Sequence, residues 1–183
     1  GCEVYISSGI RYITKELKSE KPRHLILVPL YLETFYRRIL ANVKEQGKEE
    51  FLFKMIKVSN GLLKVGIDIR RKAFKQVFDA FGGNLEMLIT GGSSIDEKYI
   101  KGFRDIGITV TNGYGITECS PIVATMRNEH FAPQSVGAIQ PELEARVVEG
   151  EIQIKGPTVF LGYYKNEEAT AEVFTEDGWF CTG

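Results

Sequence analysis

The stretch Phe81–Gly115, FGGNLEMLITGGSSIDEKYIKGFRDIGITVTNGYG, decides the fold. The continuous apolar run Leu85–Thr90 predicts a strand covered on both faces, and it leads into Gly91-Gly92. Apolar residues at helical spacing follow, and Ile106–Val110 then predicts a second strand that enters a loop at Asn112. The stretch therefore predicts a strand, a helix and a strand joined by short connections.

The same alternation precedes this stretch. Short apolar runs predict strands at Val4–Ile6 and His24–Leu30. Helical spacing of apolar residues predicts helices over Ile10–Leu17, Leu32–Val43, Phe51–Gly66 and Phe74–Phe81. Helix starts are expected at Ser7 or Ser8 and, through a Ser94/Glu97 capping box, at the helix after Gly92. Together these patterns predict an α/β fold with an open, mostly parallel sheet and helices on both faces.

The pattern changes after residue 141. Leu143–Val148 and Glu151–Lys155 alternate apolar and polar residues around Glu149-Gly150, which predicts an antiparallel hairpin. Asn166 is expected to cap a short helix that continues to Glu172. We therefore predict an α/β subdomain over residues 1–141 and the start of an antiparallel β subdomain over residues 142–183.

Composition restricts the classes of partner. The chain has 183 residues, of which 43% are hydrophobic and 26% charged, with a formal net charge of -1. Such a balance suits a globular unit with a sizeable core, and it gives no broad basic field for nucleic acid or for an anionic membrane as primary partner. The three cysteines and two histidines show no zinc-ligand spacing, and no signal peptide is evident. Reduced thiols and a cytoplasmic location are expected.

The segment Thr111–Pro121, TNGYGITECSP, carries the strongest chemical signal. Glycines allow backbone amides to approach a ligand, Tyr114 offers a flat face to a purine, Thr117 can donate to a phosphate, and Glu118 can bind Mg²⁺. Because ligands of open α/β sheets bind at the carboxyl ends of strands, this segment and Gly91-Gly92 are expected at one edge. Taken alone, the segment suits equally a simple turn with a packing tyrosine.

Several motifs in order resemble the acyl-adenylate-forming superfamily of acyl-CoA ligases, peptide-synthetase adenylation domains and luciferases. YGITE at Tyr114–Glu118 resembles the Tyr-Gly-x-Thr-Glu signature of that superfamily. The further matching segments are VPLYLETFYRRI (Val28–Ile39), FGGNLEMLITGGSSI (Phe81–Ile95), GEIQIKGPTVFLGYYKNEEAT (Gly150–Thr170) and DGWFCTG (Asp177–Gly183). The chain thus resembles an internal fragment of the large N-terminal domain of such an enzyme, which makes residues 1–141 part of its nucleotide-binding subdomain.

The resemblance implies roles for particular residues toward ATP, Mg²⁺ and the acid. The implied adenine pocket has Gly91, Gly92 and Ser93 on one side and Asn112, Gly113 and Tyr114 on the other, with Tyr114 stacked on the base. Thr117 would contact the nucleotide phosphate, and Glu118 would bind the Mg²⁺ that bridges the phosphates of ATP. Gly115 and Ile116 would lie near the substrate carboxylate. Catalysis would then rest on positioning and charge neutralisation, with Thr117 and Glu118 as the catalytic residues.

The superfamily's lysine-containing phosphate loop, its ribose-binding aspartate and its C-terminal domain with the catalytic lysine have no counterpart in the 183 residues. We therefore expect the chain by itself to bind ATP weakly and to show no adenylation. The isolated His130 is expected to be a solvated loop residue. Cys119 lies beside Glu118, where a reactive thiol is possible but no base is evident.

Two features resemble long-chain fatty-acyl-CoA ligases in particular. LVPLYLETFYRRI is followed by a hydrophobic, basic segment up to Gly66, and Ile116 stands where peptide-synthetase domains usually carry proline. The expected reaction is activation of a fatty acid as acyl-AMP and its transfer to coenzyme A, with peripheral membrane contact of the parent enzyme for a lipid substrate. Asn112 keeps open an amino-acid or aryl-acid adenylation domain that loads a carrier protein, and a catalytically inactive relative is the third alternative.

Overall fold

The computed structural model describes residues 2–9, 11–127 and 131–183. The chain divides into two compact units, residues 1–111 and 112–183. The boundary predicted between residues 141 and 142 falls inside the second unit, and as a domain boundary it stays a prediction.

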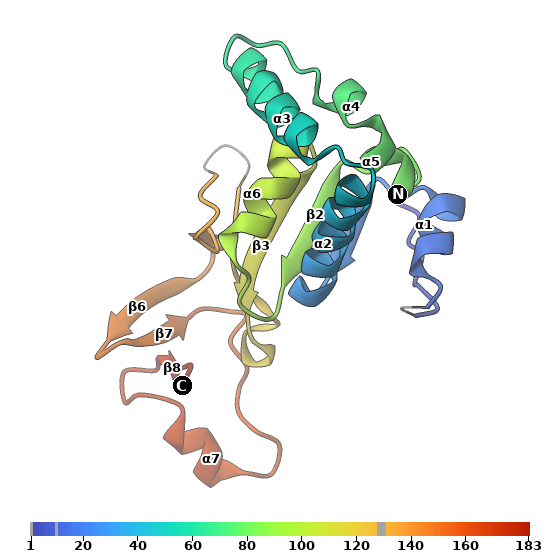
Figure 1. The fold of residues 1–183 in the computed structure, drawn as a ribbon. Coiled ribbons are helices and arrows are strands. Elements are labelled where there is room, and N and C mark those ends of the chain that lie inside the picture. Colours follow the sequence, from blue (N-terminus) through green and yellow to red (C-terminus); the bar gives the residue numbers. More distant parts are fainter. Residues whose placement is uncertain (1, 10, 128–130) are drawn as a thin grey trace. The chain divides into compact units, whose positions relative to one another are not determined.

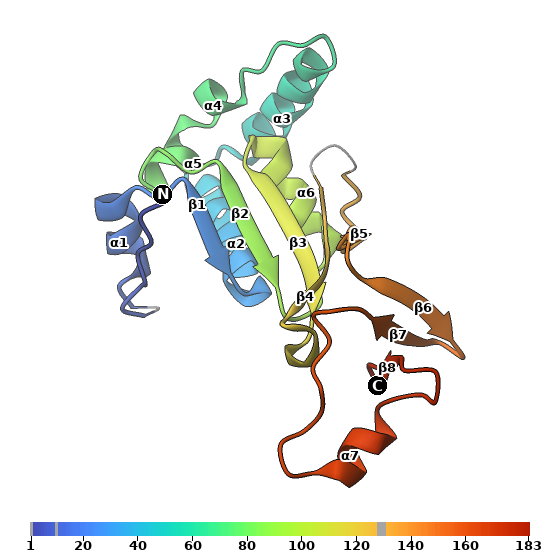
Figure 2. The ribbon, with the colours of Figure 1, turned by 180° about the vertical axis from the view of Figure 1, so that it is seen from behind.

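Helices of the first unit cover one face of its strands. The helices are α1 (Ile13–Glu20), α2 (Pro29–Glu45), α3 (Glu49–Leu63), α4 (Arg70–Ala73), α5 (Lys75–Ala80) and α6 (Glu97–Ile106). The strands are β1 (His24–Leu27), β2 (Met87–Gly91) and the first residues of β3 (Thr109–Gly115). In Figure 1 α2 lies in front of β1 and β2 and α6 lies in front of β3, and Figure 2 shows the opposite face of these strands without a helix on it. The sequence predicted helices on both faces of the sheet. Among the described residues, the helices that pack on these strands lie on one face, and Ile26 of β1 is 80% exposed.

The core of this unit consists of the apolar stripes that the helical spacing predicted. Leu32 of α2, Leu88 of β2, and Ile100 and Phe103 of α6 are fully buried. Gly102 allows α6 to pack closely against Tyr36, because a Cβ at this position would lie 2.4 Å from the tyrosine ring. Burial of these side chains provides the main driving force for this unit.

Some boundaries of the first unit differ from the predicted ones. Residues 4–6 are not a strand, and both Val4 and Ile6 are more than four-fifths exposed. Strand β1 ends at Leu27 because Pro29 is the first residue of α2, a position where the missing N–H of proline has no cost. Helix α6 is capped by Asp96, which accepts from the Lys98 N–H, instead of by Ser94.

Helix α1 begins after Tyr12, and the residues that the sequence suggested as its cap have other partners. Ser7 donates to a carboxylate oxygen of Glu16, and the Ser8 N–H donates to the other. Ile10, which was expected in this helix, lies outside the described residues.

The strands form a mixed sheet in the order β1-β2-β3-β4-β5, with β4 at Ile122–Thr125 and β5 at Ala138–Ile139. Strands β1 and β2 are parallel, whereas β3–β4 and β4–β5 are antiparallel. The α/β class is as predicted. The antiparallel pairs were not predicted, because the short strands β4 and β5 lack a strong alternating pattern.

The second unit also contains a separate three-stranded antiparallel sheet of β6 (Glu144–Val148), β7 (Glu151–Lys155) and β8 (Phe180–Cys181). Positive φ angles at Glu149 and Gly150 form the tight turn between β6 and β7, as expected for a two-residue hairpin. Helix α7 (Glu167–Glu172) starts at Asn166, whose side chain accepts from the Ala169 N–H at 3.1 Å. The hairpin and this helix cap confirm the predictions for this part of the chain.

Over the residues that the structure describes, none of the helices combines the length and the apolar character needed to cross a membrane.

Candidate functional site

In the first unit, the predicted nucleotide residues form an exposed turn at the end of β2. Gly91 is the last residue of the strand, Gly92 follows with a φ of +88°, and Ser93 is exposed. Thr90, immediately before them, is buried, and its hydroxyl oxygen has no hydrogen-bond partner. Buried hydroxyls are usually paired, so the Thr90 hydroxyl departs from the usual pattern.

In the second unit, Asn112–Gly115 are strand residues and not the loop that the sequence suggested. They belong to β3, and Gly113, Tyr114 and Gly115 pair with β4. The reason is the partner strand: β4 supplies backbone hydrogen bonds that local sequence signals at two glycines cannot indicate. The N–H of Met126, the residue directly after β4, also donates to the Asn112 carbonyl at 2.9 Å.

Asn112 is 7% exposed, and its side-chain Oδ1 has no hydrogen-bond partner. An amide oxygen in this state is a free acceptor, and the exocyclic amino group of adenine is a donor that fits it. The neighbouring Tyr114 and Ile116 are partly buried against apolar residues of the same unit. The adenine contact of Asn112 and the stacking of Tyr114 on the base stay predictions.

Thr117 and Glu118 lie in a single tight turn, the 3₁₀ helix η1 (Thr117–Cys119). The Ile116 N–H donates to the Pro121 carbonyl at 2.8 Å and closes the turn. Gly115 permits this closure, because a Cβ there would lie 2.2 Å from the same Pro121 carbonyl. Within three residues the chain presents an exposed threonine, a half-buried glutamate and a fully buried cysteine.

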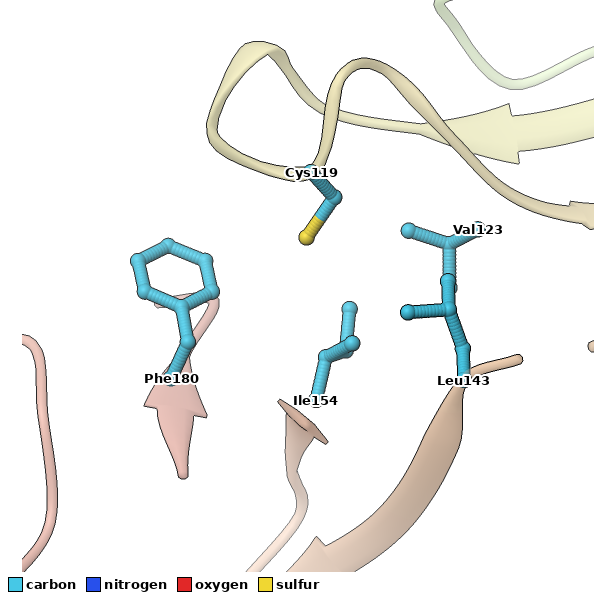
Figure 3. Packing of buried hydrophobic residues seen from close by; sticks show 5 residues of the cluster. All are labelled: Cys119, Val123, Leu143, Ile154 and Phe180. Atoms are coloured by element: carbon cyan, nitrogen blue, oxygen red, sulfur yellow. The ribbon is translucent and has the colours of Figure 1, made fainter. Parts of the chain in front are cut away.

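Cys119 anchors this turn in a hydrophobic cluster of the second unit. Figure 3 shows its sulfur pointing toward Ile154 and Phe180, with Val123 and Leu143 completing the cluster. Burial raises the pKa of the Cys119 thiol, and the negative charge of Glu118 acts in the same direction. Burial and the neighbouring charge thus both disfavour the reactive thiolate form of Cys119.

Two hydrogen bonds fix Glu118. Its backbone carbonyl accepts from the Phe160 N–H at 2.7 Å, and its carboxylate Oε1 accepts from the Tyr163 hydroxyl at 3.0 Å. No other hydrogen bond from a described residue reaches the carboxylate, which leaves Oε2 available. Sequence reasoning missed Tyr163, although it lies in the GYYKNEEAT segment that carried the resemblance.

These residues fit a nucleotide-bound Mg²⁺ better than a metal held by protein alone. Nowhere in residues 2–9, 11–127 and 131–183 do three or more histidine, cysteine, aspartate or glutamate side chains come together as a metal site. Mg²⁺ typically takes one or two carboxylates and completes its octahedron with substrate phosphates and water. The Glu118 carboxylate, with one oxygen available, can serve as such a ligand. His130 lies outside the described residues.

Comparison with known proteins places the chain in a family. The family model described as AMP-binding enzyme matches residues 1–164. The chain therefore belongs to the AMP-binding, or adenylate-forming, enzymes.

Its relatives include several ligases. Probable acyl-activating enzyme 16 of Arabidopsis thaliana is 30% identical and covers 96% of this chain, which spans 31% of that protein. A long-chain-fatty-acid–CoA ligase of Mycobacterium bovis is 30% identical over 98% of this chain and 32% of its own length. Long-chain-fatty-acid–CoA ligase 4 of Saccharomyces cerevisiae is 31% identical, with coverages of 92% and 26%. The chain thus spans less than a third of these relatives.

Solved structures confirm the fold. The adenylation domain of a carboxylic acid reductase from Segniliparus rugosus, in complex with AMP and a co-purified carboxylic acid, matches 98% of this chain with a TM-score of 0.71. The identity is 22%, and the match covers 27% of that chain. A malonyl-CoA ligase in a ternary complex with methylmalonyl-CoA and AMP matches 94% of this chain and 32% of its own, with a TM-score of 0.63 and 23% identity.

Proposed function

We propose that the chain is part of an ATP-dependent fatty acid:CoA ligase. The observation that carries this proposal is the YGITE segment folded into a tight turn, with the Glu118 carboxylate held at one oxygen and available at the other. The relatives named as long-chain-fatty-acid–CoA ligases in Mycobacterium bovis and Saccharomyces cerevisiae support a fatty acid as the substrate.

The proposed first step is formation of an acyl-adenylate. A carboxylate oxygen of the acid attacks the α-phosphorus of ATP, a P–O bond forms, and the bond to the bridging oxygen breaks to release pyrophosphate. Thr117 would donate a hydrogen bond to a phosphate oxygen, and Glu118 would hold a Mg²⁺, which would supply positive charge to neutralise the leaving pyrophosphate. Gly115 and Ile116 are assigned to the surroundings of the acid carboxylate by their position in the YGITE segment.

The proposed second step is thioester formation. The sulfur of coenzyme A attacks the acyl carbonyl, AMP leaves, and the thiol proton passes to solvent. The adenine contacts of this enzyme are assigned to Gly91, Gly92, Ser93, Asn112, Gly113 and Tyr114. Within the first unit the support is the exposed glycine turn after β2, and within the second unit it is the unpaired Oδ1 of Asn112. A cytoplasmic location also stays a proposal.

ATP–pyrophosphate exchange by the full-length parent protein tests the function. With a palmitate-like acid, we expect exchange by the wild type and a loss on the order of 100-fold in Glu118→Ala, because a positioned charge contact on the phosphates is removed. Glu176→Ala, which changes an exposed glutamate of the same unit, is the matched control and should keep wild-type exchange.

A panel of acids separates the alternatives. Exchange only with amino or aryl acids would replace the fatty-acyl assignment by the carrier-loading alternative, for which Asn112 is the supporting residue. Exchange with no acid would support an inactive relative. Unchanged exchange in Glu118→Ala would show that the metal assignment is wrong.

Peripheral membrane contact of the parent is part of the proposal, and α3 and the turn after it support it. Residues 51–67 contain three lysines and no acidic residue. Apolar side chains are exposed over the same segment: Phe51, Phe53, Val58, Leu63, Val65 and Ile67. Lysines beside exposed aromatic and aliphatic side chains are typical of helices that lie in an anionic lipid interface.

A further inference from the structure

Glu118 is held by a segment that follows it by more than forty residues. The Phe160 N–H fixes its backbone carbonyl, and the Tyr163 hydroxyl fixes its side chain. The first contact sets where the turn lies, whereas the second selects one orientation of the carboxylate. Only the second can decide which carboxylate oxygen faces a ligand.

Tyr163 is itself well positioned. Its ring packs edge-on against Phe160, with centroids 4.9 Å apart and an interplanar angle of 72°. Its N–H donates to Oγ1 of Thr170 at 2.9 Å, and that hydroxyl donates to the Asn166 carbonyl at the start of α7. Gly162 allows the approach, because its φ is +145° and a Cβ there would lie 2.6 Å from Cγ2 of Thr170.

The chemistry of the pair is a phenol that donates to a carboxylate. A phenol has an ordinary pKa of about 10, so the Tyr163 hydroxyl can donate to the Glu118 carboxylate at neutral pH. A carboxylate has about four lone-pair sites, so it can accept this hydrogen bond and still bind a cation.

We propose that Tyr163 is a positioning residue for the metal-binding carboxylate: its hydroxyl holds Oε1 of Glu118 so that Oε2 faces the nucleotide-bound cation. This inference rests on the proposed role of Glu118. Carboxylates that bind metals are commonly fixed by such outer hydrogen bonds, and loss of one weakens metal binding by about 10- to 100-fold.

The test uses the full-length parent protein and the variant Tyr163→Phe, which removes the hydroxyl and keeps the ring. The matched control is Tyr164→Phe, since the adjacent tyrosine is 88% exposed and makes no hydrogen bond to a described residue. Two quantities are measured: the Mg²⁺ concentration for half-maximal pyrophosphate exchange, and the affinity for Mn²⁺ with a non-hydrolysable ATP analogue, by electron paramagnetic resonance.

We expect Tyr163→Phe to raise the half-maximal Mg²⁺ concentration about 10-fold and to lower the Mn²⁺ affinity about 10-fold, which is the lower end for loss of an outer hydrogen bond. The KM for the acid should stay unchanged. Tyr164→Phe should match the wild type. In a Glu118→Ala background, Tyr163→Phe should weaken Mn²⁺ binding no further, because the carboxylate it positions is gone.

Wild-type metal dependence in Tyr163→Phe would overturn the positioning role, and the function would stand if Glu118→Ala still lost exchange. An equal further loss of Mn²⁺ affinity in the Glu118→Ala background would also overturn it, because Tyr163 would then act independently of Glu118. Full exchange and Mn²⁺ binding in Glu118→Ala would instead overturn the role of Glu118 on which the inference depends.

Discussion

At the scale of single residues, two glycines of the chain have opposite constraints. Gly115 lies where the chain turns back on itself, and a Cβ there would meet the Pro121 carbonyl at 2.2 Å. Gly61 lies inside α3, and a Cβ there would have no atom within 4 Å. The first glycine is required by space, whereas the second only weakens its helix.

We expect Gly115→Ala to lower the free energy of unfolding by about 1–3 kcal/mol, as overpacking at a rigid backbone contact does. Gly61→Ala is the matched control and should raise it by about 0.5–1 kcal/mol, since alanine is the better helix former. Urea unfolding of the full-length protein measures both values. Equal effects of the two substitutions would contradict the close approach at Gly115.

At the scale of elements, Arg70 links α4 to α6 by a hydrogen bond and also forms an ion pair with Asp68. Arg70, at the start of α4, donates to both carboxylate oxygens of Asp68 and also to the Arg104 carbonyl near the end of α6. Hydrogen bonding from the Arg70 side chain lowers the pKa of the Asp68 carboxyl to about 2. The Asp68 side chain is 48% exposed, so solvent screening keeps its contribution to stability small.

The sign of the pH dependence follows from that lowered pKa. A carboxyl group whose pKa falls on folding stabilises the fold above its unfolded pKa, and this stabilisation is lost as the pH falls through the folded value. The difference in free energy of unfolding between wild type and Asp68→Asn should be full above about pH 4 and shrink toward about pH 2. Urea unfolding at several pH values measures it, and a difference that stayed constant over this range would contradict the prediction.

Long periodic elements were predictable from sequence, while pairings between distant segments were not. Helix α3 runs through Asn60-Gly61 as expected, because its apolar stripe outweighs one weak helix former. The exposed Val4 and Ile6 had the composition of a strand but have no partner strand among the described residues. A strand needs a neighbour, and a short run of apolar residues does not show whether one exists.

In the candidate site, too, local features were predictable from sequence and contacts between distant segments were not. Thr117 and Glu118 were identified from one contiguous segment, and the structure places both in η1. Tyr163 was missed because its link to Glu118 spans 45 residues, and no local spacing connects them. The strand character of Asn112 was missed for a similar reason, because it depends on β4.

At the scale of the whole molecule, the net charge is close to zero although one segment is positively charged. The chain carries a formal charge of -1, yet residues 51–67 bear three positive charges beside exposed apolar side chains. Attraction to an anionic membrane depends on charges within about 10 Å of the surface, so the local value decides. A molecule that is nearly neutral overall can therefore bind such a surface in one orientation.

We expect the full-length protein to bind vesicles that contain anionic lipid more tightly than neutral ones. The double variant Lys54→Gln/Lys57→Gln should weaken this binding by about 30-fold, since each basic residue at the surface contributes about 1 kcal/mol. Lys15→Gln/Lys18→Gln, two exposed lysines of α1, is the control with the same change of charge. Equal loss in both variants, measured by vesicle co-sedimentation, would mean that binding follows net charge instead of α3.

The fully buried Cys119 next to the half-buried Glu118 provides a chemical probe of how often this turn opens. A thiol that solvent cannot reach is labelled by a disulfide reagent only when η1 leaves the cluster of Val123, Leu143, Ile154 and Phe180. The labelling rate of Cys119 therefore counts openings of the segment that carries the carboxylate. A nucleotide that binds at Glu118 should stabilise the turn and slow the labelling of Cys119. Nucleotide binding could therefore be measured from the labelling rate of a thiol that does not touch the nucleotide.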